Sequence, residues 1–314
     1  MFPNGLSMLW ESVDARQALQ ERFGFPSFDA AAEWLTAVLD ETWAVGVETC
    51  DRIVISDQNA IAWVHTDHGH LVVKWSRATT QFAKFATTAE LLHELHQQGI
   101  PVAAPLTALT GKHREVVDAP ARPLSMTVQP HIDGTLLDTS DNQAVYEAGV
   151  TLADLHAALA EHKTGPRDDP QPKQRLLNWL DSEGPGLAPE ASARLAAQVA
   201  ALPPLDVQPQ LIHSDYRASN IVMSGTEVLA VLDFDELAWN YCVQDLAQTL
   251  VVLGTHFTNW QPTPPAVRRT FLAGYQSIRP LTNAEHQWLE ALTLHRAIQA
   301  IPPGEDPAGW RNAL

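Results

Sequence analysis

The sequence predicts an α+β protein with two lobes, a small N-terminal lobe rich in β-strands and a larger helical lobe after it. Between residues 45 and 130, short apolar segments with many β-branched residues alternate with turn residues, which is typical of strands. After residue 134, apolar residues recur every three or four positions, which is typical of helices with one buried face. The length of 314 residues is sufficient for two lobes.

Residues 1–44 are expected to form a helical extension ahead of the N-terminal lobe. Apolar residues recur at helical spacing from 7 to 45. A break after Gly24 divides this segment into two helices, and Ser27 or Asp29 could cap the second one.

The N-terminal lobe is expected to span residues 45–130 and to contain a mainly antiparallel sheet with one helix packed on it. The helix is predicted at 81–98, where Gly99 ends the periodic pattern. A turn at 67–69 should join two strands as a hairpin. The predicted strands are 52–56, 60–64, 71–75, 113–117 and 124–129.

The C-terminal lobe is expected to span residues 131–314 and to be mostly helical. A Pro-rich polar loop is predicted at 165–172, and a hairpin is predicted to pair 221–223 with 228–233. The predicted helices are 142–161, 173–182, 188–201 and the region after about 242, interrupted by a loop at 262–265.

The composition limits the class of partner. The chain has 20 Lys and Arg residues against 37 Asp and Glu residues, a formal charge of −17. Such a surface repels phosphate backbones, so nucleic-acid binding is not expected. It would favour a cationic small molecule, unless the acid excess serves only solubility.

The sequence also bears on compartment and on metal binding. Cys50 and Cys242 are too far apart in sequence to suggest a disulfide framework. The N-terminus lacks the features of a signal peptide, and no apolar run approaches the ~18 residues that span a bilayer. A soluble cytoplasmic protein is therefore expected. His65, His68 and His70 surround a turn, where either a solvated turn or a metal site is conceivable.

The strongest chemical signal is the segment HSDYRASN, followed by VLDFDE. Asp215 and Asn220 are five residues apart on a loop that enters a short hairpin, so both can face one cleft. An Asp there can accept a hydroxyl proton, and an Asn can hold a metal ion. Asp233 follows thirteen residues after Asn220, at the end of the next apolar run, where a carboxylate is a natural Mg²⁺ ligand.

These segments resemble the HxDxxxxN catalytic loop and the metal-binding segment of the aminoglycoside phosphotransferases, choline kinases and type II homoserine kinases. The order and spacing of the two segments match, and the resemblance covers about residues 45–300. The segment 271–282 looks particularly like type II homoserine kinases. The resemblance implies a protein-kinase-like two-lobe fold and an ATP- or GTP-dependent phosphotransferase that acts on a small hydroxyl-bearing acceptor.

The resemblance assigns roles to the catalytic loop. Asp215 would be the catalytic base, and Asn220 and Asp233 would hold Mg²⁺. His213 would brace the loop. Ser214 stands where the family usually has Gly.

Two further acidic residues match the family less directly. Asp235 would either touch the metal or substrate, or cap the next helix. Asp245, in the segment QDLA, would support the catalytic loop from behind. His156, on the helix predicted at 142–161, is expected to be a packed helix residue.

The N-terminal lobe would bind the nucleotide. Lys74 is a charged residue at the end of an apolar strand, and in kinase-like folds such a lysine contacts the α- and β-phosphates together with a Glu from the adjacent helix. Glu90 is the first candidate for that Glu and Glu94 the second. The expected phosphate loop contains no glycine, so Ser56 and the amide of Asn59 would assist there.

The hinge between the lobes would contact the base of the nucleotide. The segment 126–134 resembles the family's hinge, so backbone groups near Gln129 and His131 would meet the adenine ring.

Two classes of acceptor fit the sequence. A cationic amino alcohol or aminoglycoside fits the net charge, whereas a hydroxy amino acid such as homoserine fits the segment 271–282. Arg217 could bind the carboxylate of such an acid, or could be a surface residue. A catalytically weak pseudokinase with a regulatory role is the alternative function, and the sequence does not indicate the oligomeric state.

Overall fold

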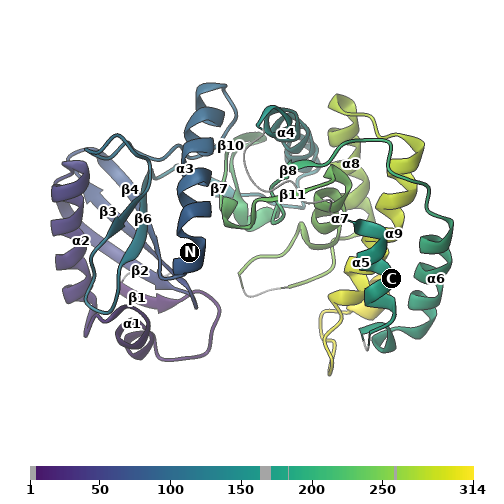
Figure 1. The fold of residues 1–314 in the computed structure, drawn as a ribbon, viewed down its shortest axis with the longest axis horizontal. Coiled ribbons are helices and arrows are strands. Elements are labelled where there is room, and N and C mark those ends of the chain that lie inside the picture. Colours follow the sequence, from purple (N-terminus) through teal and green to yellow (C-terminus); the bar gives the residue numbers. More distant parts are fainter. Residues whose placement is uncertain (1–4, 163–170, 183, 258–259) are drawn as a thin grey trace. The chain divides into compact units, whose positions relative to one another are not determined.

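The computed structural model describes residues 5–162, 171–182, 184–257 and 260–314 (Figure 1). The chain divides into two compact units, Met1–Asp133 and Gly134–Leu314. Of the loop predicted at 165–172, residues 165–170 lie outside the described residues.

The first unit is built on a six-stranded sheet with the strand order β1-β2-β3-β4-β6-β5. Neighbouring strands are antiparallel except β1 and β2, which are parallel. The predicted turn at 67–69 joins β3 and β4, where Thr66 pairs with Gly69. The strands are β1 Gly5–Met8, β2 Val47–Ile55, β3 Asn59–Thr66, β4 Gly69–Ser76, β5 Glu115–Val117 and β6 Leu124–Pro130.

The helical prediction for 7–45 is wrong at its start. Ser7 and Met8 belong to β1, which pairs with Val54 and Ile55 of β2. The exposed edge of β2 offers backbone hydrogen-bond partners to the incoming chain, and this tertiary contact overrides local periodicity.

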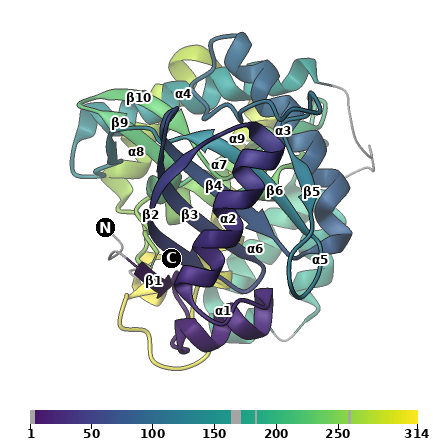
Figure 2. The same ribbon diagram turned by 90° about the vertical axis from the view of Figure 1, so that its left-hand side faces the viewer.

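Three helices accompany the sheet: α1 Ala15–Phe23, α2 Phe28–Trp43 and α3 Phe82–Gln97. Gly24 ends α1 in the left-handed conformation, and the Ser27 hydroxyl caps α2 by accepting the Ala30 N–H. Figure 2 shows α2 lying across the strands of the sheet.

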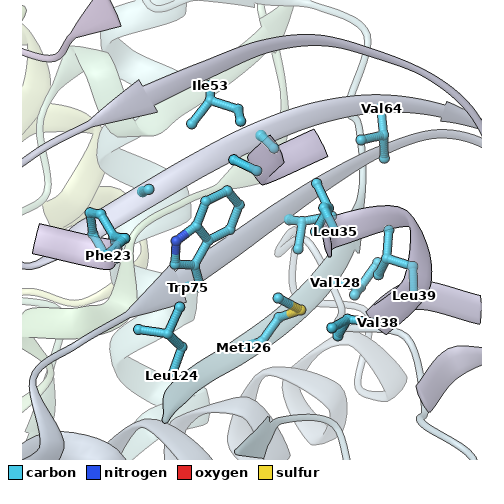
Figure 3. Packing of buried hydrophobic residues seen from close by; sticks show 14 of the residues in the cluster. Phe23, Leu35, Val38, Leu39, Ile53, Val64, Trp75, Leu124, Met126 and Val128 are labelled. Carbon is cyan, nitrogen blue, oxygen red and sulfur yellow. The ribbon is translucent and has the colours of Figure 1, made fainter. Parts of the chain in front are cut away.

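The core of this unit lies between the sheet and the first two helices (Figure 3). The Trp75 ring on β4 is fully buried and meets Phe23 of α1 edge to face, with ring centroids 6.4 Å apart. Leu35 and Leu39 of α2 belong to the same cluster. The segment 5–44 therefore contributes a large part of the hydrophobic core of the first unit.

The second unit is mostly helical, with two small sheets. One sheet has the order β10-β9-β7, and the other pairs β8 with β11. These strands are β7 Thr135–Leu136, β8 Gln210–Ile212, β9 Ile221–Ser224, β10 Glu227–Val231 and β11 Ala238–Asn240. The hairpin β9–β10 was predicted, whereas β7, β8 and β11 are too short to produce a period in the sequence.

The helices of this unit match the predicted ones closely, because each has a long apolar stripe. They are α4 Asn142–Glu161, α5 Pro172–Leu180, α6 Pro189–Ala201, α7 Cys242–Val252, α8 Pro265–Ile278 and α9 Asn283–Gln299. Within the described parts of the chain, no helix combines the length and the apolarity needed to cross a membrane.

Two glycines allow α4 and α8 to pack closely. A Cβ atom at Gly149 would lie 2.2 Å from the Phe271 carbonyl oxygen, and one at Gly274 would lie 2.0 Å from the Tyr146 carbonyl oxygen. Each glycine therefore faces the backbone of the other helix. Because α8 carries Tyr275, this contact also fixes a side chain that reaches the candidate site.

We predict that Gly274→Ala destabilises the protein by about 1–3 kcal/mol, the usual cost of overpacking. Helix propensity alone would make the Ala variant more stable by about 1 kcal/mol. The sign of the change in unfolding free energy therefore distinguishes overpacking from helix propensity. Urea unfolding followed by circular dichroism measures it. Ala273→Gly, at the exposed neighbouring position, reports the propensity contribution on the same helix. A stabilised Gly274→Ala variant would contradict the close helix contact.

Candidate active site

The predicted catalytic loop connects β8 to β9 and is held at both ends by strand pairing. Ile212 of β8 pairs with Ala238 of β11, and Ile221 of β9 pairs with Val231 of β10. The Leu232 N–H donates to the Asn220 carbonyl at 2.8 Å. This pairing places the end of the loop beside Asp233, which directly follows Leu232.

Asp215 lies at the centre of the loop and accepts hydrogen bonds from two loop residues. Arg217 Nε is 2.9 Å from Oδ1 and 3.1 Å from Oδ2 of Asp215. Asn220 Nδ2 donates to Asp215 Oδ2 at 2.9 Å and to its backbone oxygen at 2.8 Å. The carboxylate therefore has a fixed orientation, and its side chain is 22% exposed.

The electrostatic environment makes Asp215 more basic than an ordinary Asp. Burial raises its pKa, the Arg217 guanidinium opposes that change, and the charge of Asp233 raises the pKa further. A raised pKa strengthens a carboxylate as a proton acceptor. The effect of Asp233 also indicates that the two carboxylates are near each other.

His213 braces the loop through both ring nitrogens. Its Nδ1 accepts the Asp215 backbone N–H at 3.1 Å, and its Nε2 donates to the Leu232 carbonyl at 3.0 Å. These partners require the proton on Nε2. The ring thus connects the residue before Asp233 to the backbone of Asp215.

A buried carboxylate, Asp245 of α7, holds the start of the loop. Its Oδ2 accepts the His213 N–H at 2.8 Å and its Oδ1 accepts the Ser214 N–H at 2.9 Å. His156 of α4 contacts the same Oδ2 at 3.0 Å, and its other nitrogen lies 2.8 Å from the Tyr275 hydroxyl. His156 is a buried residue of α4, as expected, and its polar contacts add to its packing.

His156 and Asp245 form a buried ion pair. Burial alone would lower the pKa of His156, but Cys242, Tyr275 and the hydrogen bond that His156 donates to Asp245 raise it well above its usual value. Burial alone would raise the pKa of Asp245, but the hydrogen bond and charge of His156 lower it. The hydrogen bond between them therefore favours the charged form of each group.

Two residues of the site adopt the left-handed backbone conformation. Ser214 has φ +69° and Asp233 has φ +63°. Only Gly enters this region without a steric cost, which is roughly 1–2 kcal/mol for other residues. The strain at Ser214 explains why a Gly suits this position in similar loops.

Asp235 and Arg296 complete the surroundings. Asp235 lies in a short 3₁₀ turn, Phe234–Glu236, and does not cap α7, because Tyr241 holds the N-cap position of that helix. The Arg296 Nε–H of α9 donates to Gln248 of α7. Burial lowers the pKa of Arg296, and the charge of Asp215 opposes that change. No sequence motif pointed to Arg296, because only the packing of α9 brings this residue near the loop.

The predicted nucleotide residues Lys74 and Glu90 belong to the first unit. Lys74 is on β4, where it pairs with Ile61 of β3 and Thr127 of β6. Glu90 is on α3, and its carboxylate accepts the His113 backbone N–H at 3.2 Å and lies 2.6 Å from His113 Nδ1. The sequence did not suggest His113 as a partner of Glu90.

The other predicted nucleotide residues take part in local structure. The Ser56 hydroxyl closes the β2–β3 turn by donating to the Asn59 carbonyl at 3.2 Å. The Gln129 amide donates to the Ala103 carbonyl at 2.8 Å. The His131 N–H donates to a β4 carbonyl at 2.9 Å, so this backbone donor is already engaged.

The three histidines around the β3–β4 turn do not form a metal site. The described residues contain no group of three or more His, Cys, Asp or Glu side chains able to hold a metal ion. His65 instead contacts Asp51, with Nε2 and Oδ2 2.8 Å apart, and packs edge to face on His70.

We predict that Ser214→Gly stabilises the protein by up to about 1 kcal/mol. The substitution removes left-handed strain and keeps the N–H that Asp245 accepts, while the added freedom of Gly in the unfolded chain offsets part of the gain. The midpoint of urea unfolding measures the change. Ser277→Gly, in the regular helix α8, is the control and should destabilise the protein. Destabilisation by Ser214→Gly as well would contradict the strain.

The buried ion pair predicts a specific pH dependence. Because the folded-state pKa of His156 is raised, its stabilising effect is complete below the unfolded pKa of about 6.5 and is lost as pH rises through the folded pKa. Relative to His156→Gln, wild-type stability should therefore decline with pH above this value, by at most about 1.4 kcal/mol per pH unit. Urea unfolding from pH 6 to pH 9 tests this. Parallel curves for the two proteins would rule out a charged His156.

The chain matches the model of the phosphotransferase enzyme family, APH, over residues 55–292. It is 30% identical to homoserine kinase from Pseudomonas aeruginosa over 252 residues, 74% of each chain. It is 28% identical to homoserine kinase from Methylobacillus flagellatus over 239 residues, 73% of this chain and 70% of the relative.

Solved structures have the same fold. A microcompartment-associated aminopropanol kinase superimposes with a TM-score of 0.63 at 19% identity, covering 90% of this chain and 92% of that one. The amicoumacin kinase hAmiN superimposes with a TM-score of 0.59 at 16% identity, covering 89% and 90%. The predicted protein-kinase-like α+β fold is confirmed. The chain belongs to the phosphotransferase enzyme family and is a small-molecule kinase, which transfers a γ-phosphoryl group to a hydroxyl.

Proposed function

We propose that this kinase phosphorylates the hydroxyl of a small hydroxy amino acid such as homoserine, with ATP or GTP and Mg²⁺, and that Asp215 is the catalytic base. The observation that carries the proposal is the pairing of Asp215 with Arg217. Asp215 can accept the hydroxyl proton. Arg217 is a buried cation that could bind an anionic group of the acceptor.

The base function follows from the position and basicity of Asp215. Its carboxylate is oriented by Arg217 and Asn220, and burial raises its pKa. An acceptor hydroxyl bound next to it would lose its proton to this carboxylate as the phosphoryl group arrives. Phosphoryl transfer depends mainly on positioning and electrostatics, which such a fixed carboxylate provides.

Asn220 and Asp233 fit a Mg²⁺ site by their chemistry. The Asn220 nitrogen is occupied by two bonds to Asp215, which leaves its amide oxygen as the atom for a metal. The Asp233 carboxylate supplies a second oxygen, and oxygen ligands are those that Mg²⁺ prefers. A bound ion would neutralise charge on the nucleotide phosphates. The hAmiN structure was solved with AMP-PNP and Ca²⁺, which supports a nucleotide and a divalent ion here.

The nucleotide residues are proposed in the first unit. Lys74 would contact the α- and β-phosphates from β4, and Glu90 would assist from α3 while held by His113. The Ser56–Asn59 turn would lie over the phosphates, and the Gln129–His131 segment would meet the base. Since the His131 N–H is engaged, its carbonyl or that of Gln129 would serve as the hydrogen-bonding group.

The cations near Asp215 favour an acceptor with a carboxylate. Arg217 is 9% exposed, and its Nη1 has no hydrogen-bond partner among the described residues. A buried guanidinium nitrogen without a partner is costly, and a carboxylate satisfies it well. Arg296 adds a second positive charge nearby. The homoserine kinase relatives support the same acceptor class.

A cationic amino alcohol or aminoglycoside is the second candidate. The net charge of −17 would concentrate a cation at the surface, and the aminopropanol kinase shares the fold. Such an acceptor would have no use for the unpartnered nitrogen of Arg217. The two candidates therefore differ in their dependence on this residue.

A coupled assay with homoserine, aminopropanol, choline and an aminoglycoside tests the proposal. We predict turnover with homoserine, and a KM for homoserine that rises about tenfold or more in Arg217→Gln, because a charge-assisted hydrogen bond is lost. Asp215→Asn should lower kcat by roughly 10²-fold or more and preserve nucleotide binding by calorimetry. Asp233→Ala should weaken Mg²⁺-dependent nucleotide binding instead.

Arg217→Gln should also alter the pH profile. Since the guanidinium lowers the pKa of Asp215, its removal should raise that pKa and move the acid limb of kcat to higher pH. If the enzyme turned over only aminopropanol or an aminoglycoside, and if Arg217→Gln did not change that turnover, the acceptor would be the cationic one. Unchanged kcat in Asp215→Asn would exclude Asp215 as the base.

A further inference from the structure

The second unit contains a pocket of about 400 Å³ that involves no residue of the catalytic loop. Its walls come from α6, α7, α8 and α9 and from Ala313 and Leu314. In the second unit, α9 packs against both α6 and α7, and α7 packs against α8 (Figure 1). A volume of this size is in the range of small-molecule sites.

Two arginines line the pocket. Arg268 of α8 and Arg194 of α6 line it, and neither makes an ion pair with any described residue. Arg268 donates its Nε to the Thr263 carbonyl at 2.8 Å, which fixes the guanidinium while its terminal nitrogens remain available. Burial without a compensating charge lowers the pKa of Arg268. A carboxylate is the group that the held guanidinium of Arg268 would bind best.

The pocket also offers hydrogen-bond acceptors that lack partners. Gln198 Oε1 and Thr293 Oγ1 are buried and have no hydrogen-bond partner among the described residues. Such atoms are rare in folded proteins, because each forfeits a hydrogen bond with water. Glu290, in the same lining, adds a carboxylate. These three groups together suit a positively charged nitrogen with several N–H donors.

The rest of the lining is apolar. Leu250 of α7, Leu272 of α8 and Leu289 of α9 contribute side chains to it. A ligand that satisfies the whole pocket therefore has a carboxylate, an ammonium group and an aliphatic part. We propose that this pocket binds an α-amino acid with an apolar side chain of about the size of leucine, at a site separate from the phosphoryl-transfer site.

The pocket shares helices with the candidate active site. On α7, Leu250 lines the pocket while Asp245, five residues earlier, holds the catalytic loop. On α9, Thr293 lines the pocket and Arg296 lies near Asp215. An amino acid bound here would therefore contact the two helices that position the loop.

Calorimetry on the full chain tests the proposal with four probes. L-leucine has all three features, 4-methylpentanoate lacks the ammonium, isoamylamine lacks the carboxylate, and glycine lacks the side chain. We expect L-leucine to bind and each of the other probes to bind about tenfold more weakly or worse, because each loses one charged or apolar contact. Binding of isoamylamine as tight as that of leucine would overturn the proposal, as would no binding of leucine at 10 mM, an order-of-magnitude ceiling for a specific site.

Paired variants locate the site. Arg268→Gln should weaken leucine binding at least about tenfold, whereas Arg269→Gln, at the exposed neighbouring position outside the pocket, should not. Because Arg268 also bonds Thr263, a second variant, Thr293→Val, keeps the side-chain shape and should weaken binding as well. Equal binding by Arg268→Gln, Thr293→Val and the wild type would place leucine elsewhere and overturn the assignment.

A variant of the proposed acceptor site separates this pocket from that site. Leucine affinity should be unchanged in Arg217→Gln, and loss of leucine binding in that variant would show that leucine occupies the acceptor site instead. Because binding is measured without turnover, failure here leaves the proposed reaction unaffected. Conversely, an acceptor other than homoserine would leave the leucine pocket unaffected.

Discussion

The candidate active site depends on the buried carboxylate of Asp245. It accepts the backbone N–H groups of His213 and Ser214, and thereby holds the start of the catalytic loop against α7. An ionised carboxylate without compensation would be costly at zero exposure. The positive charge of His156 provides that compensation, and the Tyr275 hydroxyl contacts the other nitrogen of His156. The Gly149–Gly274 contact brings α4 and α8 close enough for this arrangement.

The contacts of Asp245 position the charged residues that follow in the catalytic loop. Asp245 fixes the left-handed Ser214, and the next residue is then presented between Arg217 and Asn220. Burial makes this residue, Asp215, a better proton acceptor, while Arg217 prevents the pKa from rising too far. The charge of Asp233 raises the pKa of Asp215, so these two carboxylates act on each other across the loop.

Helices α7 and α9 contribute residues both to the surroundings of the catalytic loop and to the pocket. On α7, Asp245 holds the catalytic loop and Leu250 lines the pocket. On α9, Arg296 lies near Asp215 of the loop and Thr293 lines the pocket. The first unit achieves its stability differently, by closing α1 and α2 over the Trp75 face of the sheet. Its buried cluster explains why the N-terminal segment, expected as an extension, is integral to the core of that unit.

The sequence by itself determined the long helices, the β9–β10 hairpin and the family of the chain, because these follow from local periodicity and from two closely spaced motifs. It also indicated Asp215, Asn220, Asp233 and Asp245 as polar groups in a fixed order. Only the tertiary structure decided the strand at 5–8, the His156 and Tyr275 support of Asp245, the proximity of Arg296 to Asp215 and the pocket beside α9. Each of these joins residues far apart in the chain, or a segment too short to have a period, so packing alone brings them together.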